Sequence, residues 1–138
     1  MKRFAFGLAL VFSMMLSSSA YAVTCGGPAC TGQWPHTTGC DVGAYNSVSP
    51  VSGSGYRAEL RYSNTCVTRW ARTTLIYAPP SAVNIYARNQ FGDGSGVFIN
   101  SANSNIYGYQ LWTQQRYGLQ IYACGGPNSG SYFCTSLG

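Results

Sequence analysis

The sequence contains few side chains that could carry acid–base chemistry. It has three carboxylates, Asp41, Glu59 and Asp93, and one histidine, His36. His36 and Asp41 could form a hydrolase triad with one of the serines, but the chain has no G-x-S-x-G turn to present such a nucleophile. A glycosidase needs two carboxylates flanking the scissile bond, whereas Asp93 belongs to a predicted turn and Glu59 lies between two arginines. The sequence therefore predicts no catalytic constellation, and we expect that the protein is not an enzyme.

The six cysteines are the other reactive group. They include no C-x-x-C pair, and the single histidine adds only one more ligand, so we expect neither a metal site nor another cofactor. An even number of cysteines in a short exported chain is typical of a disulfide framework. The best-supported pair is Cys124–Cys134, because the intervening Gly-Gly-Pro-Asn-Ser-Gly favours a chain reversal. The pairing of the other four stays open. The predicted disulfide cysteines are Cys25, Cys30, Cys40, Cys66, Cys124 and Cys134.

Glu59 lies in a stretch where charged side chains alternate with apolar ones. Arg57, Glu59 and Arg61 share one face of a predicted strand. The next strand along the chain could bring Arg69 or Arg72 beside them, although these two point to opposite faces because their numbers differ by an odd count. We interpret Glu59, Arg61, Arg69 and Arg72 as a structural ion-pair group that locks two strands. An anion-binding arginine patch is the alternative.

Aromatic residues are abundant, with 11 Tyr, 6 Phe and 3 Trp, and rigid amphipathic rings are enriched at binding surfaces. If residues 107–113 and 119–124 pair around 114–118, strand parity puts four side chains on one outer face: Gln110, Trp112, Gln120 and Tyr122. Aromatic faces beside amide groups suit stacking on sugar rings with hydrogen bonds to hydroxyls. We predict a ligand-binding face there, and the alternative is that this face is covered by residues 23–55 as ordinary core.

The first 22 residues have the pattern of a secretory signal peptide. Lys2 and Arg3 precede an apolar run at 4–16, and the segment ends in Ser-Ala-Tyr-Ala. A membrane-spanning helix needs about 20 apolar residues, which this run does not reach. We therefore expect residues 1–22 to be removed and residues 23–138 to form a single secreted β domain with no membrane span.

The charge of the chain argues against nucleic acid as a partner. The net charge is +5 and only 8% of residues are charged. Without residues 1–22, six arginines and three carboxylates remain, so the net charge is +3. Nucleic-acid-binding proteins gather Lys and Arg on one face, and the sequence has no such run.

Short runs of alternating polarity, broken by turn signals, follow an irregular segment at 23–55. They predict an all-β fold, a small antiparallel barrel or two-sheet sandwich of about seven short strands. The disulfides would pin the irregular N-terminal segment to the strands. The predicted strands are 56–62, 66–76, 83–88, 97–99, 107–113, 119–124 and 132–135.

Several short motifs resemble a family of small secreted bacterial proteins of unknown function, found mainly in Gram-positive organisms. The motifs are Cys30-Thr31-Gly32, Pro35 with Thr38-Gly39-Cys40, Glu59-Leu60-Arg61-Tyr62-Ser63 with Cys66, and Trp70-Ala71-Arg72. They cover residues 25–72, and the C-terminal third matches more loosely. The resemblance implies export, disulfides and an all-β fold, and it brings no activity and no catalytic residues.

We therefore expect a secreted, disulfide-stabilised protein that binds an extracellular glycan or protein. The alternative is a secreted inhibitor or toxin-like effector that presents disulfide-braced loops to a target protein.

Overall fold

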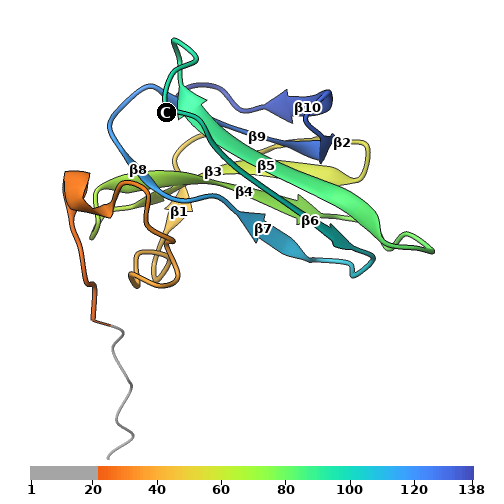
Figure 1. Cartoon of the computed structure of the whole chain (residues 1–138), viewed down its shortest axis with the longest axis horizontal. Helices are drawn as coiled ribbons and strands as arrows, with labels where there is room; N and C mark the ends of the chain where they lie inside the picture. Colours follow the sequence, from red (N-terminus) through yellow and green to blue (C-terminus); the bar gives the residue numbers. More distant parts are fainter. Residues whose placement is uncertain (1–21) are drawn as a thin grey trace, which may run out of the picture.

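The computed structural model describes residues 22–138, which fold into two antiparallel sheets packed face to face (Figure 1). The predicted signal peptide therefore lies outside the described residues except for Ala22. The two sheets share no hydrogen-bonded strand, so the fold is the predicted sandwich and not a closed barrel. No helix among residues 22–138 is long and apolar enough to cross a bilayer.

The first sheet, called sheet A, has six strands in the described chain. Its two long strands, β3 and β4, pair along their whole length, and β1 and β2 pair with β3 while β7 and β8 pair with β4. The strands are β1 (Tyr45–Asn46), β2 (Val51–Gly53), β3 (Tyr56–Ser63), β4 (Thr68–Leu75), β7 (Gln110–Trp112) and β8 (Arg116–Tyr117).

The second sheet, called sheet B, has four strands in the order β10-β9-β5-β6. A hairpin turn joins β5 to β6, where the Asp93 carboxylate accepts a hydrogen bond from the Ser95 amide at 2.8 Å. The strands are β5 (Val83–Phe91), β6 (Phe98–Ser104), β9 (Ile121–Asn128) and β10 (Ser131–Cys134).

The core lies between the sheets and follows from strand alternation. Every second side chain of β3 and β4 points inward, which is why Leu60, Ala71 and Leu75 are fully buried. Inward residues of β5 and β9 meet them from sheet B, so that apolar surface from both sheets leaves water together. The buried residues of the two inner clusters are Tyr56, Leu60, Ala71, Leu75, Ile85, Ala87, Leu111, Ile121 and Ala123.

All seven predicted strands are present as β3, β4, β5, β6, β7, β9 and β10, although their ends differ from the predicted ones, most of all at the C-terminal ends of β6 and β9. The prediction ends the fourth strand at 99 and treats the Asn- and Ser-rich residues after it as a link, whereas β6 continues to Ser104 because β5 offers partners along its length. The prediction ends the sixth strand at 124, whereas β9 continues to Asn128. Gly125 belongs in that strand because a Cβ there would lie 2.3 Å from the Thr73 hydroxyl of the opposite sheet.

The three disulfides join all six cysteines. Cys124 and Cys134 face each other across β9 and β10, which confirms the predicted pair. Cys40–Cys66 ties the irregular N-terminal segment to the start of β4, and Cys25–Cys30 closes a short loop around the 3-10 helix η1 (Gly27–Cys30). Figure 1 shows this segment (orange) at the end of the sandwich near β1 and β8.

Candidate functional site

The outer face of sheet A carries most of the polar side chains that the sequence singles out. Antiparallel pairing aligns Arg57, Thr74 and Gln110 in one row across β3, β4 and β7, and Glu59, Arg72 and Trp112 in the next row. Because directly paired residues point to the same side, both rows project away from the core.

Glu59 and Arg72 form an ion pair in the second row, with the carboxylate buried and the guanidinium partly buried. The Arg72 guanidinium donates from Nε to Oε2 at 2.7 Å and from Nη2 to Oε1 at 3.0 Å. Asn46 donates to Oε1 at 3.2 Å, and the Thr74 hydroxyl donates to Oε2 at 3.4 Å. Burial alone would raise the pKa of Glu59, but the hydrogen bonds and charge of Arg72, helped by Asn46 and Arg57, hold the pKa below its ordinary value.

The other two arginines of the predicted ion-pair group take different partners. Arg61 donates to the Asn46 side chain at 2.8 Å and to the Ala44 carbonyl, so it anchors the N-terminal segment to β3. Arg69 is an odd number of residues from Arg72, so it points to the opposite face of β4. Its guanidinium carbon lies over the Tyr62 ring, 4.5 Å from the ring centroid. The inclusion of Arg69 in the Glu59 network is therefore wrong, and the odd spacing between the two arginines is the physical reason.

The disulfide-rich segment covers one part of this outer face. Trp70 projects outward from β4, yet it is only 1% exposed because Cys30, Cys40 and Cys66 pack on it. The sulfurs of Cys25, Cys30 and Cys40 lie within 4.8 Å of one another, but each is bonded in a disulfide and is not a thiolate ligand.

A cleft opens where this segment meets the edge strand β7. Its volume is about 360 Å³, within the range of small-ligand sites. The His36 ring lies edge-on to Trp112 with ring centroids 5.7 Å apart, and the centroid of the Trp34 ring is 6.2 Å from that of His36. The lining residues are Trp34, His36, Asn100, Gln110, Leu111 and Trp112. We call this the β7 cleft.

The amides of the β7 cleft are placed to accept and donate hydrogen bonds. The Asn100 Nδ2 group donates to the Trp112 carbonyl at 2.7 Å, which fixes the side chain and leaves Oδ1 as an acceptor. Gln110 is exposed and makes no side-chain hydrogen bond with the described residues. The cleft thus combines flat rings with uncharged polar groups.

Comparison with known families matches residues 28–117 to a family described as "Protein of unknown function (DUF2690)". The chain belongs to this family. No curated protein and no solved structure matches the chain. The DUF2690 match contains every residue that lines the β7 cleft, and it also contains the Glu59–Arg72 pair.

The structure separates the four side chains of the predicted ligand-binding face. Gln110 and Trp112 line the β7 cleft on sheet A, whereas Tyr122 projects from the outer side of sheet B, where its hydroxyl accepts a hydrogen bond from Gln90. Gln120 is exposed just before β9. The predicted pairing of 107–113 with 119–124 is therefore wrong, because β7 pairs with β4 and β9 pairs with β5 and β10.

The reason lies in residues 114–118, which the sequence predicts as a turn. Instead the chain runs on along β4, because β7 and β8 both pair with that strand. Gln115 between them is fully buried, accepting from the Thr68 hydroxyl at 2.8 Å and donating to the Thr38 hydroxyl at 2.9 Å. The chain crosses to sheet B only after Gly118, whose φ of 127° needs a glycine.

Trp34 and Asn100 are site residues that sequence reasoning missed. Trp34 lies in the N-terminal segment between the cysteines. The one sequence feature that could have indicated it is a large aromatic residue close to His36 in an irregular loop. Asn100 lies in the stretch predicted as a link, where nothing in the sequence distinguishes it from neighbouring Asn and Ser residues. His36 lies against Trp112 and makes no hydrogen bond or ion pair with Asp41 within residues 22–138.

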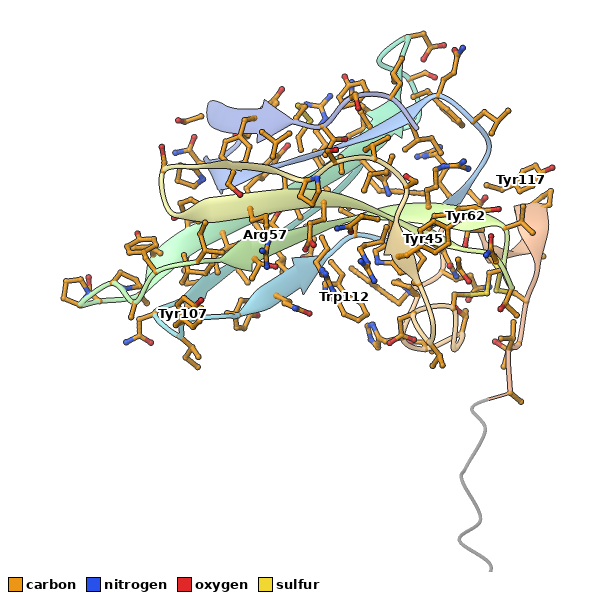
Figure 2. All side chains as sticks on the ribbon, turned by 180° about the vertical axis from the view of Figure 1, so that it is seen from behind. Tyr45, Arg57, Tyr62, Tyr107, Trp112 and Tyr117 are labelled. Atoms are coloured by element: carbon orange, nitrogen blue, oxygen red, sulfur yellow. A yellow bond between two sulfur atoms is a disulfide. The ribbon has the colours of Figure 1, made fainter. Side chains whose placement is uncertain are left out.

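A second cleft of about 480 Å³ lies at one end of sheet A. Figure 2 shows Tyr45, Tyr62 and Tyr117 at this end of the sandwich and Tyr107 at the other. Leu119 is 73% exposed beside the cleft, and the Arg69 guanidinium donates to the Gly118 carbonyl at 2.7 Å. The lining residues are Tyr62, Val67, Arg69, Tyr117, Gly118 and Leu119. We call this the end cleft.

Proposed function

We propose that this DUF2690 protein is an extracellular, non-catalytic binding protein that takes a saccharide in the β7 cleft. Three disulfides support an oxidising location, because such bonds persist outside the reducing cytosol. The family match supplies no activity, so the argument for a ligand depends on the cleft itself.

The observation that carries the proposal is the side-by-side arrangement of three rings with two amides. Trp34, His36 and Trp112 offer flat faces and edges, and such rings give large contact area with little loss of side-chain entropy. A pyranose ring has one apolar face of C–H groups and a rim of hydroxyls. The apolar face fits against Trp112, and the hydroxyls can bond to the free Oδ1 of Asn100 and to the amide group of Gln110.

Two single substitutions test whether the saccharide binds in the β7 cleft. One removes Trp112, which lines the cleft, and the other removes Tyr122, which the sequence predicts to lie on the same ligand-binding face. A glycan array probed with the wild-type protein identifies bound saccharides, and affinity for the best of them is then measured by calorimetry. Trp112→Ala should weaken binding by at least about tenfold, as expected for loss of an aromatic anchor. Tyr122→Ala, the matched control on sheet B, should leave the affinity unchanged and the protein folded.

If Trp112→Ala stays folded and binds as well as wild type, the β7 cleft is not the site. If both variants stay folded and both lose binding, the β7 cleft alone does not account for the site, because Tyr122 lies on sheet B. Circular dichroism in the near ultraviolet establishes the fold of each variant.

The end cleft favours a second candidate, a secreted inhibitor or effector that binds a protein. Tyr45, Tyr117 and Leu119 are exposed apolar side chains gathered in one region, and aromatic residues of this kind are enriched at protein interfaces. Leu119→Asp should abolish capture of a protein target by this end and leave saccharide binding unchanged, so the two candidates separate in one experiment.

A further inference from the structure

The arginines that follow residue 21 differ in what they contact. Five have a partner that fixes the guanidinium, whereas Arg57 has no hydrogen bond, ion pair or cation–π contact with any described residue, and its side chain is exposed. The partnered arginines are Arg61 with Asn46, Arg69 with Tyr62, Arg72 with Glu59, Arg88 with Tyr132, and Arg116 with Phe91 and Phe98.

The outer face of sheet A carries an excess of positive charge around Arg57. Three guanidinium groups, those of Arg57, Arg61 and Arg72, face a single carboxylate, Glu59. Glu59 is engaged on both oxygens by Arg72, Asn46 and Thr74, so it has little capacity left for Arg57. A free guanidinium in such a field favours an anion, and its planar fork matches the oxygens of carboxylate and phosphate groups.

Arg57 also lies within reach of a ligand that fills the β7 cleft. It shares a row with Thr74 and Gln110, and Gln110 lines that cleft. Neighbouring strands are separated by about 4.8 Å, so the Arg57 backbone lies roughly 10 Å from that of Gln110. Figure 2 shows Arg57 and Trp112 on the same side of sheet A. A saccharide stacked on Trp112 that extends across β4 would bring its next unit to the Arg57 guanidinium.

We infer that the saccharide bound by this protein is acidic, with a carboxylate, phosphate or sulfate group held by Arg57. This inference rests on the proposed saccharide site in the β7 cleft. The rings and amides of the cleft hold the sugar ring and its hydroxyls, and Arg57 adds a charge-assisted contact that selects the acidic unit.

The test uses an array of oligosaccharides in which each acidic member stands beside its uncharged counterpart. Oligogalacturonide with its methyl ester is one such pair, and phosphorylated and sulfated sugars with their parent sugars are others. The full protein is compared with Arg57→Gln, Arg57→Lys and Trp112→Ala. Arg88→Gln removes the same charge from the outer side of sheet B and is the matched control.

Wild type should bind acidic members at least about tenfold more tightly than their counterparts, because charge-assisted hydrogen bonds are roughly twice as strong as neutral ones. Arg57→Gln should remove that preference, Arg57→Lys should retain part of it, and Arg88→Gln should leave it unchanged. The class of acidic sugar that gives the largest preference identifies the charged group.

Two other outcomes are informative in different ways. If acidic and uncharged members bind equally and Trp112→Ala still abolishes binding, the role of Arg57 is overturned while the saccharide site stands. If the wild-type protein binds no member, or if Trp112→Ala binds as tightly as wild type, the proposed function itself fails.

Discussion

Replacing Glu59 with glutamine perturbs one buried carboxylate while keeping the shape of the side chain. Glu59 is 3% exposed and accepts four hydrogen bonds, two of them from Arg72. The amide of a glutamine would keep one accepting oxygen, but its NH₂ group would face either the Nε or the Nη2 donor of Arg72. The variant therefore loses one charge-assisted hydrogen bond and leaves the Arg72 charge without its counter-ion.

The expected loss of unfolding free energy is about 2–3 kcal/mol. A hydrogen bond to a charged group contributes about 1.5–3 kcal/mol, and breaking a buried ion pair by removing one partner costs about 3–5 kcal/mol. The lower part of this range applies because the Arg72 side chain is 18% exposed and water can partly replace its partner. For a domain of this size the loss corresponds to a decrease in Tm of roughly 10 °C.

Thermal unfolding monitored by circular dichroism at pH 7 measures this difference. Asp93→Asn is the matched control, because it makes the same chemical change in an exposed turn, where the amide oxygen can still accept from Ser95. We expect its Tm to equal that of wild type. A Tm for Glu59→Gln equal to that of wild type would refute the structural role of the ion pair, and if saccharide binding were lost at the same time, Glu59 would belong to the binding site.

The difference in Tm between wild type and Glu59→Gln should also depend on pH. The folded state holds the pKa of Glu59 below its ordinary value of 4.5, so the carboxylate stabilises the protein above that pH. This contribution is lost as the pH falls through the folded-state pKa. The Tm of wild type should therefore approach that of Glu59→Gln below pH 4.5, and a constant difference down to pH 2 would contradict the assignment.

Three further outcomes follow from the structure. Mass spectrometry of non-reduced protein, alkylated under denaturing conditions, should show a loss of six hydrogens and no label, since all three disulfides are formed; labelling of two or more thiols would refute the pairing. Gly125→Ala should lower the unfolding free energy by about 1–3 kcal/mol in a urea titration, because the new methyl would meet the Thr73 hydroxyl; an unchanged midpoint would mean that the sheets can separate. Burial, together with Tyr77, raises the pKa of Tyr56 to about 12, so unfolding free energy should fall as the pH rises from 10 towards 12, and less steeply in Tyr56→Phe. If the unfolding free energy of wild type and Tyr56→Phe falls equally with pH, a group other than Tyr56 is responsible for the loss.

The parts of the fold that the sequence predicts are those where one strand face is buried and the other is not. Residues 56–62 alternate strictly, and β3 follows them closely. Parity alone placed Arg69 and Arg72 on opposite faces, which the ion pair and the Tyr62 contact confirm. It did not say which of the two faces Glu59, because that depends on the register between β3 and β4. Cys124–Cys134 followed from a local reversal, which depends only on residues near in sequence.

The parts that the sequence does not predict depend on contacts between distant segments. Nothing local distinguishes a turn at 114–118 from an extended stretch, because the decision comes from Thr38 and Thr68, which satisfy the buried Gln115 amide. Only part of the candidate site could be predicted, because the other part also depends on contacts between distant segments. Gln110 and Trp112 follow from parity, but Trp34 and His36 reach them only because Cys40–Cys66 folds the N-terminal segment onto sheet A.

The position of β9 has a consequence for where the folding unit ends. The family match stops at residue 117, yet β9 lies beyond it, between β5 and β10 in the middle of sheet B. Ile121 and Ala123 from this strand fill the core against Leu60 and Ala71, and Gly138 exchanges two backbone hydrogen bonds with Ile121. A fragment cut at the boundary of the match would leave β5 without one neighbour and would expose to water the core surface that Ile121 and Ala123 cover. The matched region of this chain is thus smaller than the unit that folds as one piece, so expression and engineering need to keep residues 118–138 with it.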